Sequence, residues 1–385
     1  MSKLPRLLAL AICVGLLATA AAQAQSVVDA PGFVAGPRVI AEGLLWSSSQ
    51  GVWLTSPAAG PRMLVPGVSL GSVLAGSGWI VVERPAGISA ARLGRRLAAV
   101  PLLRRCLPVK RASGARLVAV AGGELYAVVR AGCLHQRGNG GDELVRIRLG
   151  RPGARSLAMV SSGAVSLAAA GPRLALTYTR PTVFGPVSVD MLSARSGQLL
   201  YRLRSPKNDL LTHPTTELDT SGDALVTGTL PVEPGPVVTG WWADARSHAV
   251  HALSGLQAGG PPYPYTDSLL VAAISDGYIA YESYTERGAQ EIEVLDLATR
   301  KTRAVATFPG SASVLGVDLD NSRLAWAQQS FGFTSPTPSE TCVTQTSPLG
   351  PVMLAQTDIS IPSTPIVVEG DPISPRTGPL CPPPP

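Results

Sequence analysis

One short pattern recurs along this chain and constrains its fold more than any other feature. A turn residue is followed by a pair such as Leu-Ala or Ile-Ala, and the copies lie about 35 to 55 residues apart, which is the spacing of β-propeller blades. A short apolar run precedes each copy, and a strand of alternating polarity follows it, as in residues 291–297. The clearer copies are centred on Leu125, Leu174, Leu225, Ile279 and Leu324, and the weaker ones on Leu44 and Ile80.

The surroundings of each copy predict strands. Alternation over such short spans, bounded by Gly, Pro, Asn and Asp, is typical of β-structure, and no segment after the N-terminal stretch has convincing helical periodicity. One small sheet cannot bury both of its faces, whereas radial packing of several sheets covers them. The seven units are expected near residues 38–67, 72–104, 115–161, 164–205, 214–255, 268–309 and 312–369.

We therefore predict an all-β, seven-bladed β-propeller with four-stranded antiparallel blades over residues 38–369. Residues 25–37 are expected to form an N-terminal lead-in, and residues 370–385 a proline-rich C-terminal tail. A β-sandwich is the alternative fold. Six or eight blades also remain open, because the first two units are the least regular.

The first 24 residues have the features of a signal peptide. Lys3 and Arg6 precede an apolar run at residues 7–22, and Ala22 and Ala24 supply small residues before the expected cleavage at Gln25. A membrane anchor is the alternative, because the run approaches the length that crosses a bilayer. We predict that the mature chain is secreted or otherwise extracytoplasmic, with no transmembrane anchor after cleavage.

The sixth unit resembles a known repeat. The sequence "SDGYIAY" at residues 275–281 and the hairpin "VLDLATRK" at residues 294–301 are similar to a blade of the TolB-type and WD-like β-propeller superfamily. The fifth and seventh units, "LDTSGDALVTG" and "VDLDNSRLAWA", are looser matches. Because this superfamily includes many unrelated functions, the resemblance implies a fold and little else.

Charge gives no sign of a nucleic-acid partner. The chain has 32 basic and 26 acidic side chains, so its formal net charge of +6 is modest for 385 residues, and loss of the leader would lower it further. The four cysteines after the leader invite two disulfides in an exported chain. The expected topology places Cys106 and Cys133 on one rim of the third unit, and Cys342 beside Cys381 near the seventh, so these are the predicted pairs.

No motif convincingly indicates catalysis, a metal or a cofactor. Ser69 lies in a Gly-x-Ser-x-Gly pattern, but it links two strand-rich units instead of a strand and a helix, so chance is the better interpretation. His248 and His251 are three residues apart, and on a strand their rings would point to opposite faces. Asp318 begins a calcium-loop-like "DLDNS", which lacks the Gly and the distal Glu of that motif. We assign no catalytic residue, no metal ligand and no cofactor.

The longer loops offer a binding surface on one rim. They contribute aromatic residues and an arginine, which are the residue types that anchor interfaces. We predict an exported, non-catalytic propeller that binds a protein or cell-envelope polymer there. The alternative is a propeller enzyme of the glycosidase or lyase type, with carboxylates meeting at the central channel. The rim residues are Phe184, Tyr263, Tyr265, Tyr284, Arg287, Phe331 and Phe333, and the carboxylates are Asp209, Glu217, Asp219, Asp267 and Glu286.

Overall fold

The computed structural model describes residues 26–368 of the 385-residue chain. Gaps in this description fall at residues 57–58, 111–115, 135–140, 162, 180–185, 207–210, 231–236, 254–271, 285–289, 309–311, 335–343 and 361–363. The predicted signal peptide, the whole predicted C-terminal tail (370–385) and the cysteines Cys342 and Cys381 lie outside the described residues.

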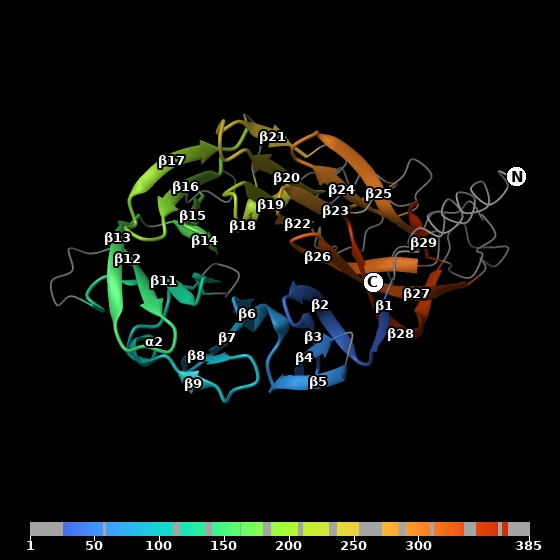
Figure 1. Ribbon diagram of the computed structural model, residues 1–385, viewed down its shortest axis with the longest axis horizontal. Coiled ribbons are helices and arrows are strands. Elements are labelled where there is room, and N and C mark those ends of the chain that lie inside the picture. The colour runs from blue at the N-terminus through green and yellow to red at the C-terminus, as the bar shows by residue number, and fades with distance from the viewer. Residues whose placement is uncertain are drawn as a thin grey trace, which may run out of the picture.

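Seven sheets stand around a central axis, and the prediction of a seven-bladed propeller with four-stranded antiparallel blades is confirmed (Figure 1). Blade 1 contains β2 (Phe33–Ile40), β3 (Gly43–Ser48), β4 (Gly51–Ser56) and β5 (Ala59–Pro66). Blade 2 contains β6 (Val73–Gly76), β7 (Trp79–Arg84), β8 (Gly87–Arg92) and β9 (Ala98–Ala99). Blade 3 contains β10 (Val118–Ala121), β11 (Glu124–Arg130), β12 (Asp142–Arg148) and β13 (Ala154–Val160).

The other blades follow the same order from the axis outward. Blade 4 contains β14 (Ala164–Ala170), β15 (Arg173–Tyr178), β16 (Ser188–Ser193) and β17 (Leu199–Arg204). Blade 5 contains β18 (Thr212–Leu218), β19 (Ala224–Leu230), β20 (Val237–Ala243) and β21 (Val250–Ala252). Blade 6 contains β22 (Ala272–Ser275), β23 (Tyr278–Tyr284), β24 (Gln290–Asp296) and β25 (Lys301–Phe308). Blade 7 contains β26 (Ala312–Asp320), β27 (Arg323–Thr334), β28 (Thr344–Asp358) and β1 (Ser26–Ala30).

The ring closes through the N-terminal strand, which the sequence analysis did not anticipate. β1 pairs antiparallel with β28, with Ser26 opposite Gln356, so blade 7 takes its outer strand from residues 26–30. The expectation that residues 25–37 are a lead-in, and that blade 7 lies wholly within residues 312–369, is corrected accordingly. The residues after β28 instead add the short parallel strand β29 (Ile366–Val367) to the outer edge of blade 6.

Two short helical turns interrupt the strands. A 3₁₀ turn, η1 (Leu70–Ser72), enters blade 2, and a five-residue helix, α2 (Pro101–Arg105), leaves it. Pro101 begins α2, where a missing N–H is harmless, and Arg104 and Arg105 lie in its last turn, where cations suit the helix dipole. The fourth strand of blade 2, β9, therefore has only two residues, and α2 occupies the end of the unit expected at residues 72–104. Among the residues that the structure describes, no helix is long and apolar enough to cross a bilayer.

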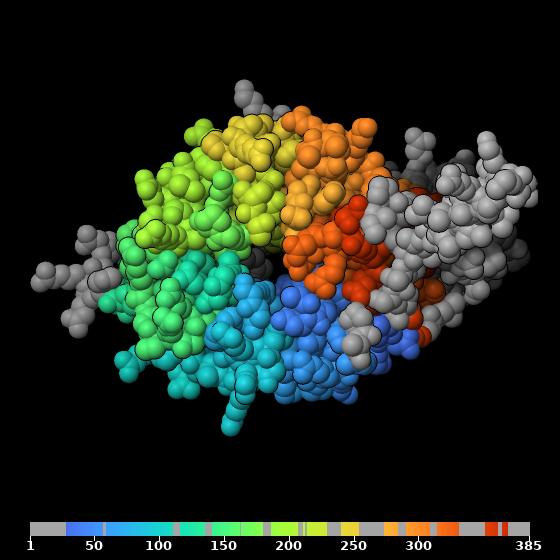
Figure 2. All heavy atoms as spheres, viewed as in Figure 1, coloured from blue at the N-terminus to red at the C-terminus, as the bar shows by residue number. Residues whose placement is uncertain are grey.

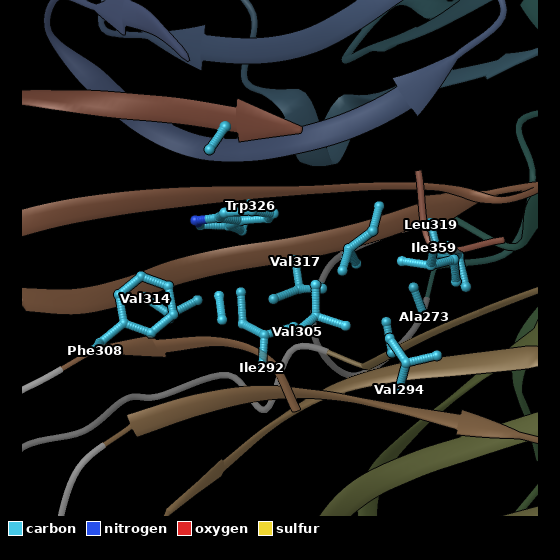
Figure 3. Packing of buried hydrophobic residues seen from close by; sticks show 14 residues of the cluster. Ala273, Ile292, Val294, Val305, Phe308, Val314, Val317, Leu319, Trp326 and Ile359 are labelled. Carbon is cyan, nitrogen blue, oxygen red and sulfur yellow. The ribbon is translucent and has the colours of Figure 1, made fainter. Parts of the chain in front are cut away.

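Apolar side chains from neighbouring blades meet between the sheets and form the core. Between blades 6 and 7, Trp326 and Phe308 pack with Ile292, Val305 and Val317 (Figure 3). Trp326 is fully buried, and its Nε1 donates to Gln328 Oε1 at 2.7 Å. The polar atom of this large side chain is thus satisfied while its ring fills the space between two sheets.

The inner strands of all blades run in the same direction along the axis. Each blade begins at the axis and turns outward through a hairpin, such as Ala41–Glu42 in blade 1 and Asp276–Gly277 in blade 6. These first hairpins define one rim of the ring, which we call the hairpin rim. Asp276 and Gly277 both have positive φ, at 49° and 80°, which the tight reversal requires. Equivalent residues of different blades therefore lie at the same depth along the axis.

Candidate functional site: the central channel

The predicted binding rim cannot be assembled from the described side chains. Phe184, Tyr263, Tyr265 and Arg287 lie outside the described residues. Tyr284 lies at the end of β23, and Phe331 and Phe333 lie in β27, but only the backbone of these three is described. Rim binding by these residues stays a prediction.

A polar cavity of about 240 Å³ opens instead at the axis. The ring is hollowed at its centre, where the inner strands approach one another (Figure 2). Its lining comes from blades 1 to 5 and combines charged, hydroxyl and apolar side chains. The lining residues with charges or hydroxyls are Arg38, Ser72, Glu83, Arg116, Ser166, Thr215, Thr216 and Glu217.

Charged residues occupy a layer that is apolar in other blades. In the strand register of blade 1, Arg38 lies opposite Leu45, and in that of blade 7, Asp318 lies opposite Ala325. In both cases the opposite residue is seven places further along the chain. The residues with the same seven-residue spacing in the other inner strands are Leu74, Ala119, Ala168 and Ala273. In blade 5 the first hairpin is longer, so Glu217, which lies opposite Leu225, is displaced by one residue from this layer. Three inner strands thus present ionisable side chains at nearly one depth.

Two of these acids connect neighbouring blades. Asp318 Oδ2 accepts a hydrogen bond from the backbone N–H of Val39 in blade 1. Glu217 accepts one from the backbone of Ile274 in blade 6. An inner strand has a neighbour on one side alone, so its other edge carries N–H groups that need an acceptor. The two carboxylates satisfy such groups, and each thereby holds its blade to the next.

Both acids have raised pKa values. The protein that surrounds the channel limits solvation of Glu217 and raises the pKa of its carboxyl to about 7, and the negative charge of Asp318 contributes to the rise. Burial likewise raises the pKa of Asp318 to about 6, against the opposing effect of Arg38. The side chain of Glu217 is nevertheless reachable by solvent from the channel. Near neutral pH these groups can therefore hold or release a proton.

The two arginines of the lining differ in how they are held. Arg116 is 6% exposed, and its guanidinium lies 3.1 Å from Glu83 Oε1 and donates to Pro108 O at 3.0 Å. It is therefore already neutralised. Arg38 Nη1 donates to the backbone oxygen of Val73 in blade 2, and among the described residues no carboxylate lies within ion-pair distance of Arg38. Its charge faces the cavity.

Hydroxyl groups complete the lining near Glu217. Ser166 Oγ accepts from the backbone N–H of Thr216 at 3.2 Å, and Thr177 and Thr216 hydroxyls lie 2.5 Å apart. These contacts join blade 4 to blade 5 and leave the hydroxyl of Thr215 paired with Thr227 at 2.8 Å. The lining can therefore donate to and accept from a polar molecule.

Asp219, another carboxylate proposed from the sequence, lies away from this cavity. Asp219 is buried in the first hairpin of blade 5, where Oδ1 accepts from Gly222 N at 2.8 Å and Asp223 N at 2.9 Å, and Oδ2 accepts from Gly277 N at 3.2 Å. It holds the hairpin and links blades 5 and 6, which is a structural role. Asp209, Asp267 and Glu286 lie outside the described residues.

The histidines, Ser69 and the described cysteines lie elsewhere. His248 stacks on Tyr201 and His251 on Trp242, in blade 5 and at its boundary with blade 4. Ser69 is exposed before η1, and no helix of the elbow type follows it. Cys106 and Cys133 are brought together with their Cα atoms 5.6 Å apart, a separation that a disulfide spans. In the described part of the chain, no group of three His, Cys, Asp or Glu side chains is placed to hold a metal ion.

Glu217 was a candidate carboxylate from the sequence and Asp318 part of a calcium-loop-like segment, whereas no sequence pattern pointed to Arg38, Glu83 or Arg116. Each of these three is a single charge near a strand end, where charges are common. Alignment of the units on their first hairpins shows Arg38 at a position where other blades have Ala or Leu. That comparison between units is the signal that points to the channel.

Comparisons with known proteins give distant similarities to solved structures. No protein-family model and no curated protein matches this chain. A puromycin-hydrolysing peptidase of Mycobacterium tuberculosis is similar over 80% of this chain and 49% of its own, with 11% identity and a TM-score of 0.47. The propeller domain of the Trilobed protease of Pyrococcus furiosus is similar over 78% and 90%, with 9% identity and a TM-score of 0.32. The chain spans about half the length of the puromycin-hydrolysing chains it matches, and the similarity extends to the β-propeller fold alone.

Proposed function

We propose that the central channel is the functional site of this protein and that it binds a small polar molecule. The observation that carries the proposal is the meeting of Arg38 and Glu217, from blades 1 and 5, in a cavity of about 240 Å³. Charged groups inside a protein are unfavourable unless they are paired or used, and the equivalent inner positions of other blades show that apolar residues fit there. The volume suits a molecule smaller than a typical drug.

The test is a cavity-filling substitution with a matched control. Ser72 lines the cavity, whereas Ser69, three residues earlier, is exposed outside it. A library of small polar compounds is screened by calorimetry against the wild type, and the compounds that bind are titrated into Ser72→Trp and Ser69→Trp. We expect affinity to fall at least tenfold in Ser72→Trp and to stay unchanged in Ser69→Trp. If no compound binds, or if binding is insensitive to Ser72→Trp, the channel is not the site.

A second candidate function is catalysis at the same place. The favouring observation is that Glu217 and Asp318 have pKa values of about 7 and 6, the range in which carboxyl groups serve as general acid or base. No described His or Tyr lines the cavity, so a glycosidase or lyase of this type would depend on carboxylates. Glycoside and uronide substrates are the compounds to test. Turnover that falls at least a hundredfold in Glu217→Gln supports an enzyme; turnover unchanged in Glu217→Gln contradicts it.

Export and kinship complete the proposal. The charge and apolar pattern of residues 1–24 supports secretion, and N-terminal sequencing of the mature protein tests it, with Gln25 as the expected first residue.

Kinship with TolB-type and WD-like propellers is supported by "SDGYIAY" at the first hairpin of blade 6. Binding of a protein or cell-envelope polymer to the loop-rich rim remains a second surface to test, by pull-down from the producing organism's envelope.

A further inference from the structure

We propose that the molecule bound in the channel is a zwitterion of the amino-acid type, with its ammonium group at Glu217 and its carboxylate at Arg38. The inference rests on the channel being a ligand site, as proposed above. It specifies the class of ligand from the charges that the lining leaves without an ionic partner.

The four charged side chains of the cavity fall into two kinds. Arg116 and Glu83 neutralise each other at 3.1 Å across blades 2 and 3. Arg38 and Glu217 have no ion pair within 4 Å among the described residues. The positive charge of Arg38 opposes the rise that burial causes in the pKa values of Glu217 and Asp318, but neither carboxylate lies within 4 Å of it, so a positive and a negative group face the cavity without direct contact.

Each of these two groups is held by a backbone contact with another blade. Arg38 is tied to Val73 O in blade 2, and Glu217 to the backbone of Ile274 in blade 6. Blades 2 and 6, which supply these two anchors, lie on different sides of the hollow (Figures 1 and 2). Unpaired charges in a confined space are poorly solvated, and a ligand with both signs relieves both at once.

The balance of charge disfavours a ligand of one sign. The lining carries two arginines and two glutamates, so a neutral zwitterion leaves it balanced, whereas a simple amine or a simple acid does not. Asp318 stands beside Arg38 and influences Glu217, but it does not line the cavity, and its carboxylate is held by Val39 N–H. The planar fork of Arg38 suits a carboxylate, which accepts two parallel hydrogen bonds.

A series of compounds of graded length tests the class. Glycine, β-alanine, 4-aminobutyrate and 6-aminohexanoate are titrated at pH 7.5 and low salt, with hexanoate and hexylamine as probes that carry one charge each. We expect at least one zwitterion to bind at least tenfold more tightly than both singly charged probes. Hexylamine or hexanoate binding as tightly as the best zwitterion would overturn the inference while leaving a channel site intact.

Substitutions of Glu217 and Arg38 test which side chain binds the ammonium end of the zwitterion and which binds its carboxylate end. Glu217→Gln should weaken the best zwitterion at least tenfold and leave hexanoate unchanged, and Arg38→Gln should weaken it while leaving hexylamine unchanged. Arg38→Lys keeps the charge but loses the fork, so it should retain part of the affinity and also show that the ring tolerates a change at this position. Matched controls are Glu42→Gln at the hairpin rim and Arg62→Gln on β5, both exposed and both expected to bind as the wild type does.

The failures of the two proposals are distinguishable. If zwitterions fail to bind but other small polar compounds bind and respond to Ser72→Trp, the channel is a site for another class and the inference is wrong. If no small polar compound binds, both proposals are wrong. If a zwitterion binds equally well to Glu217→Gln and Arg38→Gln variants that remain folded by their melting temperature, the assignment of its ends is wrong.

Discussion

Asp318 offers the sharpest test of how the channel residues hold the ring together. The carboxylate of blade 7 accepts the backbone N–H of Val39, a buried residue at the inner edge of blade 1. In Asp318→Ala that N–H loses its acceptor, which costs about 1–3 kcal/mol of the free energy of unfolding. Unfolding entropies of about 2 cal/mol/K per residue convert 1 kcal/mol to about 1.5 °C for a cooperative unit of this size. The melting temperature should therefore fall by about 1.5–4.5 °C.

Asp318→Asn separates the hydrogen bond from the charge. Its amide oxygen can still accept from Val39, so at neutral pH the variant should stay within about 0.5 kcal/mol of the wild type or exceed it. Asp320→Ala is the control, because its carboxylate lies 3.5 Å from Arg323 at the partly exposed surface, where an ion pair contributes less than about 1 kcal/mol. Thermal unfolding followed by circular dichroism measures all three.

The pH dependence gives an independent check. Burial raises the pKa of Asp318 from 3.8 to about 6, so the folded protein binds this proton more tightly than the unfolded chain does. The stability gained from this group is complete below about pH 4 and is lost as the pH rises through 6. Asn cannot titrate, so the melting temperature of Asp318→Asn minus that of the wild type should increase from pH 4.5 to pH 7.5. Equal melting temperatures for Asp318→Ala and the wild type, or a difference independent of pH, would refute the assigned contact.

Two further changes test the contact between blades 7 and 1 and the disulfide between Cys106 and Cys133. Gly316→Ala places a Cβ 1.9 Å from the backbone oxygen of Gly36, so blades 7 and 1 must separate, and we expect a loss of about 1–3 kcal/mol in the free energy of unfolding by urea titration. Gly71→Ala is the control, with no atom near the added Cβ, and a comparable loss there would contradict the explanation. Cys106→Ser with Cys133→Ser opens a loop with a sequence separation of 27, which predicts a loss of about 3–4 kcal/mol, and a peptide mass map of the native protein should show these two cysteines joined. Free thiols at both positions in the native protein would contradict the pairing.

The blades were predictable because most of their contacts are local. Each hairpin is specified by a few turn residues, such as Asp276 and Gly277, and by alternation in the flanking strands. The predicted unit at residues 164–205 corresponds to strands from Ala164 to Arg204 for this reason. The repeat period then favours radial packing, because each four-stranded unit has two faces to cover.

The closure of the ring and the channel charges were not predictable in the same way. Ser26 pairs with Gln356, and no local pattern links residues so far apart. The register that brings Arg38 and Glu217 to one cavity depends on how blades 1 and 5 are placed around the axis. A charge in an inner strand looks like any half-exposed strand residue until the units are aligned on their hairpins.

Glu217 and Asp318 each accept a hydrogen bond from the inner strand of the next blade, and the difference in side-chain length decides what else each can do. Val39 and Ile274, which donate to them, are themselves equivalent, because each pairs with a residue five places on. Asp318 stays behind the lining, while the longer Glu217 reaches the cavity. Glu217→Asp should therefore withdraw the carboxylate from the cavity by one methylene, weaken the best channel ligand in calorimetry by at least tenfold, and leave the melting temperature within about 1 °C of the wild type if the shorter acid still reaches Ile274. A variant that loses stability but keeps full affinity would show that the acid of blade 5 serves the ring and not the ligand.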